Sequence, residues 1–375
     1  MVGHNGECQS HFLSGGALKV IKDGIEMAKK RLASVLVILF SLAGSLLACQ
    51  PQDIAETDFP DMIILEEHPI TQIALSGPVT SSQTEVSGMA WCDDNLILLP
   101  QFPDQFAEDG IGRVFSIPKS ALSAYLASDS PEAIEPYRMA FDTADLSKEL
   151  TGFEGFEAIV FVQDVVYVTV ETRQSGGMMG YLVRGTVAED CSAVTLDPST
   201  VHELPPQADL SNMTDETILV YQDQFYTVYE ANGVNVNPEP VAHVFDLTLD
   251  PVGTVAFPSI EYRVTDATTL AEDGTFWVIN YFYPGDTKLL PGDDQIAMDY
   301  GIGLTHQTAE QVERLVEMQI TEAGIVLVDR IPIYLQLDSE ESYNWEGLVR
   351  MEDGFLMVTD EYPTTVLGYV AGVKE

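Results

Sequence analysis

Basic residues are scarce in this 375-residue sequence. Only 17 Lys and Arg stand against 59 Asp and Glu, which gives a formal net charge of −42. An acidic excess of this size repels phosphate backbones and anionic headgroups. The composition therefore argues against nucleic acid as a partner and against docking of the folded body on anionic lipid. It is compatible with divalent cations.

Cysteine and histidine are also few, at 4 and 6 residues. The sequence has no Gly-x-Ser-x-Gly elbow, no His-Glu-x-x-His, no phosphate-binding glycine loop with lysine and no Cys-x-x-Cys. These absences argue against serine-hydrolase, zincin, P-loop and dithiol chemistry. Carboxyl groups are the abundant reactive side chains, so the remaining chemistry is acid–base catalysis or the binding of a hard cation.

An export signal is predicted at the start of the chain. A basic stretch (residues 29–31) precedes an uncharged apolar run (residues 32–47), which ends in Leu46-Leu47-Ala48-Cys49. This ending resembles the lipobox of bacterial lipoproteins, in which the cysteine becomes the acylated first residue. The run is shorter than the about 20 residues of a spanning helix, which favours a cleaved signal over a retained anchor helix.

We therefore expect a signal segment over residues 1–48, with the true start at Met27, and a lipidated tether over residues 49–60. The resemblance places the protein in the bacterial cell envelope, at the outer membrane or cell surface. Its membrane contact would be the lipid on Cys49. Cys92 and Cys191 then remain as an even pair in a compartment that permits disulfides. Their pairing is open, because the two predicted turns lie at different radii and bridging needs Cα atoms within about 7 Å.

The rest of the chain contains a fifteen-residue pattern written five times. Each copy begins with a small polar or acidic residue, continues as an apolar strand, and has an aspartate at its centre. A second apolar strand follows, and a polar residue closes the copy. The copies are Ser87–Gln101, Glu157–Glu171, Glu216–Glu230, Asp266–Asn280 and Glu346–Asp360. Two strands around a turn residue predict a β-hairpin in each copy.

Two more strand-like runs follow each hairpin except the last, which is followed by one. The missing strand is available in residues 62–75. Repeated four-stranded units of this kind predict an all-β fold, a five-bladed β-propeller over residues 61–375. Each blade would have four antiparallel strands, with the ring closed by an N-terminal strand. The last repeat interval is long enough for a sixth blade, the alternative, but we assign its excess to an insertion at 286–310 with a short helix near 308–314.

The motif Trp345-Glu346-Gly347-Leu348, followed by Asp353-Gly354 and Val358-Thr359-Asp360-Glu361, resembles the blade motif of known propellers. The similar families are the phytase-like, gluconolactonase-like and SdiA-regulated propellers. The five acidic or polar strand starts are also similar to the calcium-activated nucleotidase (apyrase) propeller. These resemblances imply a propeller fold, and the families often bind calcium on the propeller axis.

The repeat predicts two neighbouring rings of polar side chains at one rim of the channel. The first residues of the copies form the inner ring, which is Ser87, Glu157, Glu216, Asp266 and Glu346. The last residues form a second ring, which is Gln101, Glu171, Glu230, Asn280 and Asp360. Close carboxylates repel one another unless protonated or neutralised, and Ca²⁺ takes six to eight oxygen ligands. We expect the inner ring to bind Ca²⁺, with Asp215 as an alternative to Glu216. The other interpretation is a channel lined by hydrated polar groups.

Loops at the same rim could complete a ligand pocket. Tyr281 and Tyr362 lie there with Phe102, Phe282 and Tyr283, and these aromatics could instead pack between blades. Arg173, Arg263 and Lys288 could bind an anionic group of a substrate or form salt bridges. The functional prediction is a calcium-dependent hydrolase of phosphoester or of ester and lactone substrates, in which Glu157 and Glu346 are the catalytic residues. The alternative is a non-catalytic platform for a small molecule or protein. We expect a monomer.

Overall fold

The computed structural model describes residues 62–337, 342–360 and 365–372. These residues are mostly β, with several four-stranded antiparallel sheets. The predicted signal segment, Cys49 and the tether lie outside the described residues. Within those residues, no helix is long and apolar enough to cross a membrane.

Five hairpins occur where the repeat predicts them. They are β4 (Val86–Cys92) with β5 (Asn95–Pro100), β8 (Phe153–Val162) with β9 (Val165–Gln174), β13 (Asp215–Tyr221) with β14 (Gln224–Tyr229), β17 (Arg263–Ala267) with β18 (Thr275–Phe282), and β23 (Trp345–Met351) with β24 (Gly354–Thr359). The central aspartate of each copy lies between its two strands. In the last hairpin the turn is Glu352-Asp353, with Glu352 at positive φ, and Gly354 already opens β24. The Asp353-Gly354 pair of the sequence motif therefore spans the end of the turn and the start of β24.

Each hairpin belongs to a larger sheet, which we call blades 1 to 5 in chain order. Blade 3 adds β15 (Val241–Asp246) and β16 (Pro251–Ala256) in simple antiparallel order. Blade 5 adds β25 (Leu367–Val370) and then β3 (Thr71–Ile73), which pairs antiparallel with β25. The prediction that a strand near the N-terminus completes the last sheet is therefore confirmed.

Blades 1, 2 and 4 depart from the simple pattern. Blade 1 adds β6 (Gly112–Pro118) and β7 (Tyr137–Asp142), while blade 2 adds β10 (Gly177–Val187). The fourth strand of blade 2 is split into β11 (Ala193–Leu196) and β12 (His202–Leu204), which both pair with β10. Blade 4 adds β20 (Val312–Thr321), with its fourth strand split into β21 (Gly324–Leu327) and β22 (Ile333–Leu335). Because β7 pairs with β11 in parallel, blades 1 and 2 form one nine-stranded sheet.

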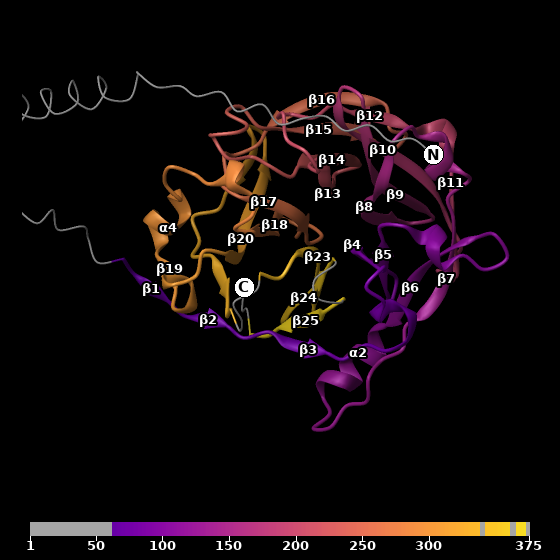
Figure 1. The fold of residues 1–375 in the computed structure, drawn as a ribbon, viewed down its shortest axis with the longest axis horizontal. Helices are drawn as coiled ribbons and strands as arrows, with labels where there is room; N and C mark the ends of the chain where they lie inside the picture. Colours follow the sequence, from indigo (N-terminus) through magenta and orange to yellow (C-terminus); the bar gives the residue numbers. More distant parts are fainter. Residues whose placement is uncertain (1–61, 338–341, 361–364, 373–375) are drawn as a thin grey trace, which may run out of the picture. The chain divides into compact units, whose positions relative to one another are not determined.

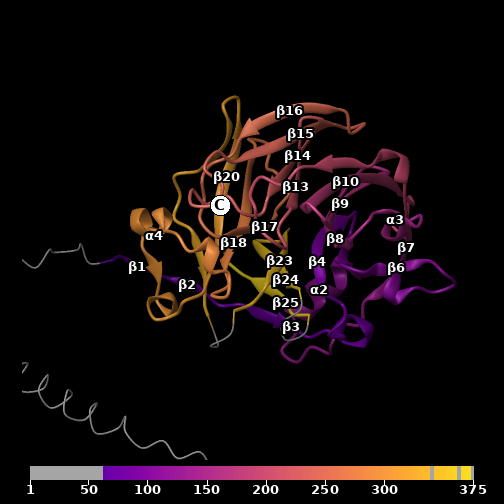
Figure 2. The ribbon, with the colours of Figure 1, turned by 45° about the horizontal axis from the view of Figure 1, so that its top comes forward.

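The first strands of the five hairpins contact one another in a closed cycle. The order is β4, β8, β13, β17, β23 and back to β4 (Figure 1). The turned view in Figure 2 shows the same sequence of sheets around the centre. Buried apolar side chains fill the space between each sheet and the next. Examples are Phe141 with Phe156 between blades 1 and 2, Tyr167 with Phe225 between blades 2 and 3, Val244 with Phe276 between blades 3 and 4, Trp277 with Phe355 between blades 4 and 5, and Leu356 with Leu98 between blades 5 and 1.

Short segments complete the fold outside the blades. β1 (Ile64–Leu65) pairs with β19 (Ile302–Gly303), and β2 (Glu67–His68) pairs with β22. The helices are α2 (Lys119–Leu126), α3 (Leu146–Glu149) and α4 (Gln295–Tyr300). The insertion therefore does carry a helix, but the position predicted for it near 308–314 is wrong. β20 begins at Val312, which pairs with Phe282 of β18.

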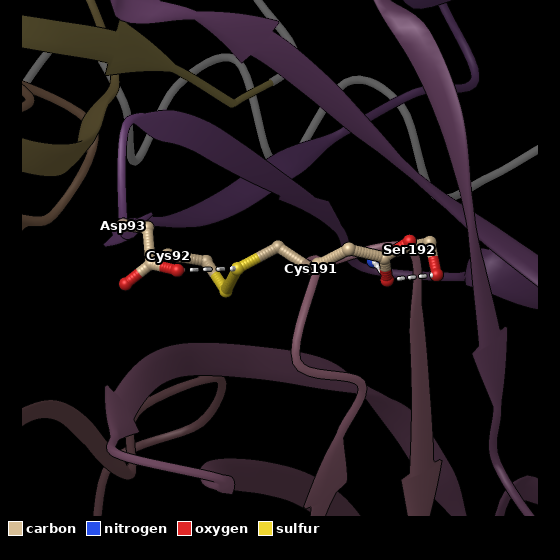
Figure 3. The surroundings of a disulfide bond; sticks show 5 residues. Cys92, Asp93, Cys191 and Ser192 are labelled. Atoms are coloured by element: carbon tan, nitrogen blue, oxygen red, sulfur yellow. Dashed lines mark hydrogen bonds between the residues drawn. A yellow bond between two sulfur atoms is a disulfide. The ribbon is translucent and has the colours of Figure 1, made fainter.

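Cys92 and Cys191 form a disulfide, with their Cα atoms 6.1 Å apart (Figure 3). Cys92 ends β4, and Cys191 lies in the turn between β10 and β11. The predicted difference in radius is removed by the parallel pairing of β7 with β11, which draws the outer turn of blade 2 toward blade 1. The bond joins the same two blades that share one sheet.

Candidate functional site

All five residues of the predicted inner ring lie at a break in strand register. In each hairpin the pairing shifts at the start of the first strand, between Val86 and Gly88, Phe156 and Ile159, Asp215 and Thr217, Val264 and Ala267, and Trp345 and Gly347. The extra residues include Ser87, Glu157, Glu216, Asp266 and Glu346. A β-bulge bends the strand and re-aims a side chain that would otherwise follow the pleat. The repeat therefore encodes both the hairpin and the bulge.

A cavity of about 320 Å³ opens where three of these bulges meet. We call it the carboxyl cavity. Its lining contains nine residues that the sequence predicted at this rim, namely Gln101, Glu157, Glu171, Glu216, Arg263, Tyr281, Tyr283, Glu346 and Asp360. It also contains Asn212, Ser342 and Asn344. Glu216 lines the cavity, whereas the alternative Asp215 accepts a hydrogen bond from Thr227 Oγ1 at 2.8 Å.

The glutamates of this cavity are almost fully buried. Glu157, Glu171, Glu216 and Glu346 are 4%, 2%, 8% and 8% exposed. Burial is the main reason why the pKa of each lies above its ordinary value, and neighbouring carboxyl groups raise it further. For Glu171 the result is a pKa of about 8. The raised pKa favours the protonated form of each group, and at about 8 for Glu171 it makes this carboxyl group a proton donor at pH 7.

An ion pair lies beside these buried acids. Arg263 Nη1 lies 2.7 Å from Glu230 Oε1, and Arg263 Nε donates to Asp286 Oδ2 at 2.8 Å. Burial raises the pKa of Glu230, while Arg263 and a hydrogen bond with Glu216 lower it. Burial alone would lower the pKa of Arg263, but Glu230 and Tyr281 hold it above its ordinary value. The structure therefore places a carboxylate–guanidinium pair next to carboxyl groups whose pKa values are raised.

Asn344 links two of the acids on the opposite side of the cavity. Its Nδ2 donates to Glu346 Oε1 at 2.7 Å and to Asp360 Oδ2 at 3.2 Å. The hydroxyl of Tyr281 donates to the Asn344 carbonyl oxygen, which fixes the orientation of the amide. After burial, Asp360 is the largest cause that raises the pKa of Glu346. Across the cavity, Gln101 Nε2 donates to Glu157 Oε1 at 3.3 Å.

Five predicted site residues do not reach this cavity. Ser87 donates to the carbonyl oxygen of Phe156, and Asp266 accepts from the backbone N–H of Ala267 and Leu348. Both side chains are thus used to join neighbouring first strands. Asn280 is buried against the carbonyls of Glu261 and Arg263, Glu230 lies behind Arg263, and Arg173 pairs with Glu154 at 2.7 Å. Tyr362 lies outside the described residues.

The predicted calcium ligands do not assemble as one set. Because Ser87 and Asp266 are bonded to the backbone, only Glu157, Glu216 and Glu346 of the five line the cavity. Among the described residues, no group of three or more His, Cys, Asp or Glu side chains is arranged to hold a metal ion. The side chains therefore do not fit the five-ligand site, and calcium stays a prediction.

Three lining residues were not identified from the sequence. Asn212, Ser342 and Asn344 all lie just before the first strand of a hairpin, at positions 212 and 342–344. The repeat was aligned only from the strand start onward, so these positions fell outside it. Segments that enter the first strand of a blade come from the same rim as the predicted rings. A polar residue two to four positions before a copy was the available signal.

The chain has no match among known sequence families, and no curated protein matches it. Solved structures do resemble it. One is a structure from the GH130 family of mannoside phosphorylases. That family contains glycoside hydrolases that target β-1,2 mannosidic linkages in Candida mannan. This structure has 10% identity, a TM-score of 0.48, and coverage of 84% of this chain and 97% of that one.

Two further structures are similar at the same level. The glutaminyl cyclase of Myxococcus xanthus has 8% identity, a TM-score of 0.39, and coverage of 82% and 100%. The exo-β-1,3-galactanase of Phanerochaete chrysosporium has 8% identity, a TM-score of 0.44, and coverage of 80% and 64%. Similarity at these values carries no argument about the activity of this chain, which has to be argued from its own residues.

Proposed function

We propose that this chain is an exported hydrolase on a five-bladed β-propeller, and that the carboxyl cavity cleaves a glycosidic bond by acid–base catalysis. One observation carries the proposal. In the same cavity, burial raises the pKa of Glu157 well above its ordinary value, while Asn344 donates hydrogen bonds to the neighbouring carboxyl groups of Glu346 and Asp360. Two carboxyl groups in different protonation states are what glycosidic cleavage requires.

In the proposed reaction Glu157 is the proton donor. Its carboxyl proton passes to the leaving glycosidic oxygen as the bond from that oxygen to the anomeric carbon breaks. A water molecule adds to the anomeric carbon and gives a proton to the Glu346–Asp360 pair. In the proposal these two neighbouring carboxyl groups, both bound by Asn344, share one proton before the reaction and can therefore accept a second. The products are two hydroxyl compounds. Gln101, Asn212, Tyr283 and Ser342 supply hydrogen-bonding groups for hydroxyls of the substrate.

The composition of the cavity favours this bond over the other predicted substrates. The one guanidinium in its lining is already bound to Glu230 and Asp286, so little positive charge is left for a phosphate. No serine hydrolase motif accompanies the carboxyl groups, which weakens the ester and lactone prediction. The second predicted function, a non-catalytic ligand platform, uses the same cavity and differs in the absence of turnover.

We also propose the compartment in which the protein acts. The disulfide between Cys92 and Cys191 suits an oxidising compartment, as the predicted lipobox at Cys49 requires. We propose a lipid-anchored protein of the bacterial cell envelope, with membrane contact through Cys49 alone. Labelling with fatty acid in cells that express the whole chain tests this, since the Cys49→Ala variant should be neither acylated nor cleaved, and label on that variant would contradict the proposal.

The activity is tested with glycosides of graded leaving groups. Glu157→Gln should lower kcat by about 10²–10⁴-fold on alkyl glycosides. The loss should be much smaller on dinitrophenyl glycosides, because that leaving group needs no proton. Glu346→Gln should lower kcat on both. The matched control is Glu203→Gln, an exposed glutamate on β12. An activity that neither cavity variant changes contradicts the proposal, and ligand binding without turnover supports the platform.

A further inference from the structure

The chain that enters blade 5 has a cavity on each side. Asn344 and Glu346 line the carboxyl cavity. Their neighbours in the chain, Tyr343 and Trp345, line a separate cavity of about 140 Å³. Successive residues of an extended chain point to opposite sides, which explains this alternation. The place of Asn344 therefore depends on what holds the residues before and after it.

Glu313 of β20 holds both of these neighbours. It is only 1% exposed. Its Oε1 accepts from the backbone N–H of Tyr343 at 2.9 Å, and its Oε2 accepts from the indole Nε1–H of Trp345 at 2.7 Å. One carboxyl group thus fastens the chain on either side of Asn344. Glu313 is not one of the described residues that line the carboxyl cavity.

A strand pair in blade 4 explains why two supports reach the same amide. Glu313 lies directly opposite Tyr281 in the antiparallel pairing of β20 with β18. Directly opposite residues project from the same face of a sheet, so both side chains face blade 5. Tyr281 donates its hydroxyl to the carbonyl oxygen of Asn344, while Glu313 holds the chain around it. The backbone of Glu313 is fixed in turn, because its N–H donates to His306 Nε2 at 3.1 Å.

We propose that Glu313 is a positioning residue of the carboxyl cavity, which holds Asn344 where one amide can bind Glu346 and Asp360 together. The amide nitrogen lies 2.7 Å from Glu346 Oε1 and 3.2 Å from Asp360 Oδ2. The second distance is already at the long end of a hydrogen bond. Misplacement by about 1 Å would break at least one of the two bonds, and errors of this size can cost about 10²-fold in rate. The effect on rate rests on the proposed hydrolysis, whereas the effect on Glu346 does not.

Glu313→Gln tests the inference with little change of shape. Glutamine has one acceptor oxygen, and its NH2 group cannot accept the N–H of Tyr343 or of Trp345. One of the two supports is therefore lost. The matched control is Glu317→Gln on the same strand. Glu317 is also buried, at 7% exposed, but it binds Arg330 at 3.0 Å instead of the chain before β23.

NMR titration of the whole protein with 13C-labelled glutamate measures the pKa of Glu346 without any substrate. The signal of Glu346 is identified by its loss in Glu346→Gln. Burial is the main reason why this pKa lies above its ordinary value. The charged and titratable groups that face Glu346 are Asp360, Glu157, Arg263 and Glu230, and all of them are kept in the test variants.

An amide N–H favours the ionised form of a carboxyl group that it binds. Asn344→Ala should therefore raise the pKa of Glu346, and Glu313→Gln should raise it in the same direction by about 0.5 pH unit or more. Glu317→Gln should leave it unchanged. The double variant Asn344→Ala/Glu313→Gln should titrate like Asn344→Ala alone, because Glu313 acts through that amide. On alkyl glycosides, Glu313→Gln should lower kcat by about tenfold or more with little change in KM.

An unchanged pKa of Glu346 in Glu313→Gln, additive shifts in the double variant, or an unchanged kcat in an active protein would each overturn the inference. If Glu313→Gln does not fold, Trp345→Phe takes its place, because it removes the indole N–H and keeps an aromatic ring. It should also raise the pKa of Glu346, and an unchanged value overturns the inference. A protein without turnover in which these variants still shift the pKa supports the role of Glu313 and contradicts only the proposed hydrolysis.

Discussion

Glu171 lies near the end of the second hairpin, where burial and neighbouring acids disfavour the charged form of its carboxyl group. Burial and the nearby Glu230 raise its pKa to about 8 from the ordinary 4.5. A raised pKa in the folded state means that the unfolded chain gives up its proton first as the pH rises. The contribution of Glu171 to stability is therefore complete below pH 4.5 and is lost as the pH rises through about 8.

Replacing Glu171 by Gln should remove this loss, because the amide keeps the shape of the protonated acid. We expect nearly equal free energies of unfolding at pH 4.5 and a more stable variant at pH 8.5. Each unit of pKa shift is worth roughly 1.4 kcal/mol, so the gain is of order a few kcal/mol. Urea titrations at both pH values measure it, with Glu203→Gln as the control. A variant that is less stable than the parent at pH 8.5 would show that Glu171 is anionic and has a partner.

Sequence reasoning found most residues of the carboxyl cavity but not their partners. Glu157, Glu216 and Glu346 were visible because they recur at one position of the repeat. Ser87 and Asp266 occupy the same position, yet each bonds to the backbone of a neighbouring first strand. A short hydroxyl side chain reaches only the adjacent strand, and the Asp266 carboxylate is held by two N–H groups. Equal places in a repeat therefore do not give equal roles.

At the scale of elements, the role of the closing strand β3 can be tested directly by mutation. Ile73 is 3% exposed and packs in the core between blades 5 and 1, whereas Thr71 of the same strand is exposed. Ile73→Ala should lower the free energy of unfolding by about 2–5 kcal/mol, and Thr71→Ala by less than about 0.5 kcal/mol. Equal effects in denaturant titrations would mean that β3 does not close the last sheet in solution.

The elements were predictable where local pattern decides them. The five hairpins follow from alternating apolar residues around an aspartate, and the closing strand follows from the count of strands. The split fourth strands and the parallel pairing of β7 with β11 were not predictable, because they depend on contacts between blades. The helix of the insertion was misplaced for a related reason. Residues 312–319 pair one by one with β18, which makes this segment a strand, while α4 begins after its cap, Asp294.

At the scale of the whole molecule, the net charge of −42 is the dominant quantity. Self-repulsion destabilises a compact acidic chain, and salt screens it over a Debye length of about 10 Å at 0.1 M. We expect NaCl to raise Tm. If no calcium site forms, CaCl2 at the same ionic strength should raise it by no more than MgCl2, and EDTA should leave it unchanged. A calcium-specific rise that Glu157→Gln reduces would instead support the predicted calcium ring.

The pairing of β1, β2 and β3 with strands from the end of the chain also limits when the protein can finish folding. These strands precede everything else in the described chain, yet their partners are β19, β22 and β25, in the last quarter of the sequence. Loops that join distant parts of a chain are the slowest to close. During synthesis β1, β2 and β3 are made before their partners, and β3 stays unpaired until β25 has been made. The last sheet therefore cannot close in a chain that ends before β25. The export proposed above requires a chain that stays unfolded until it has crossed the membrane, and this topology postpones closure in the same way.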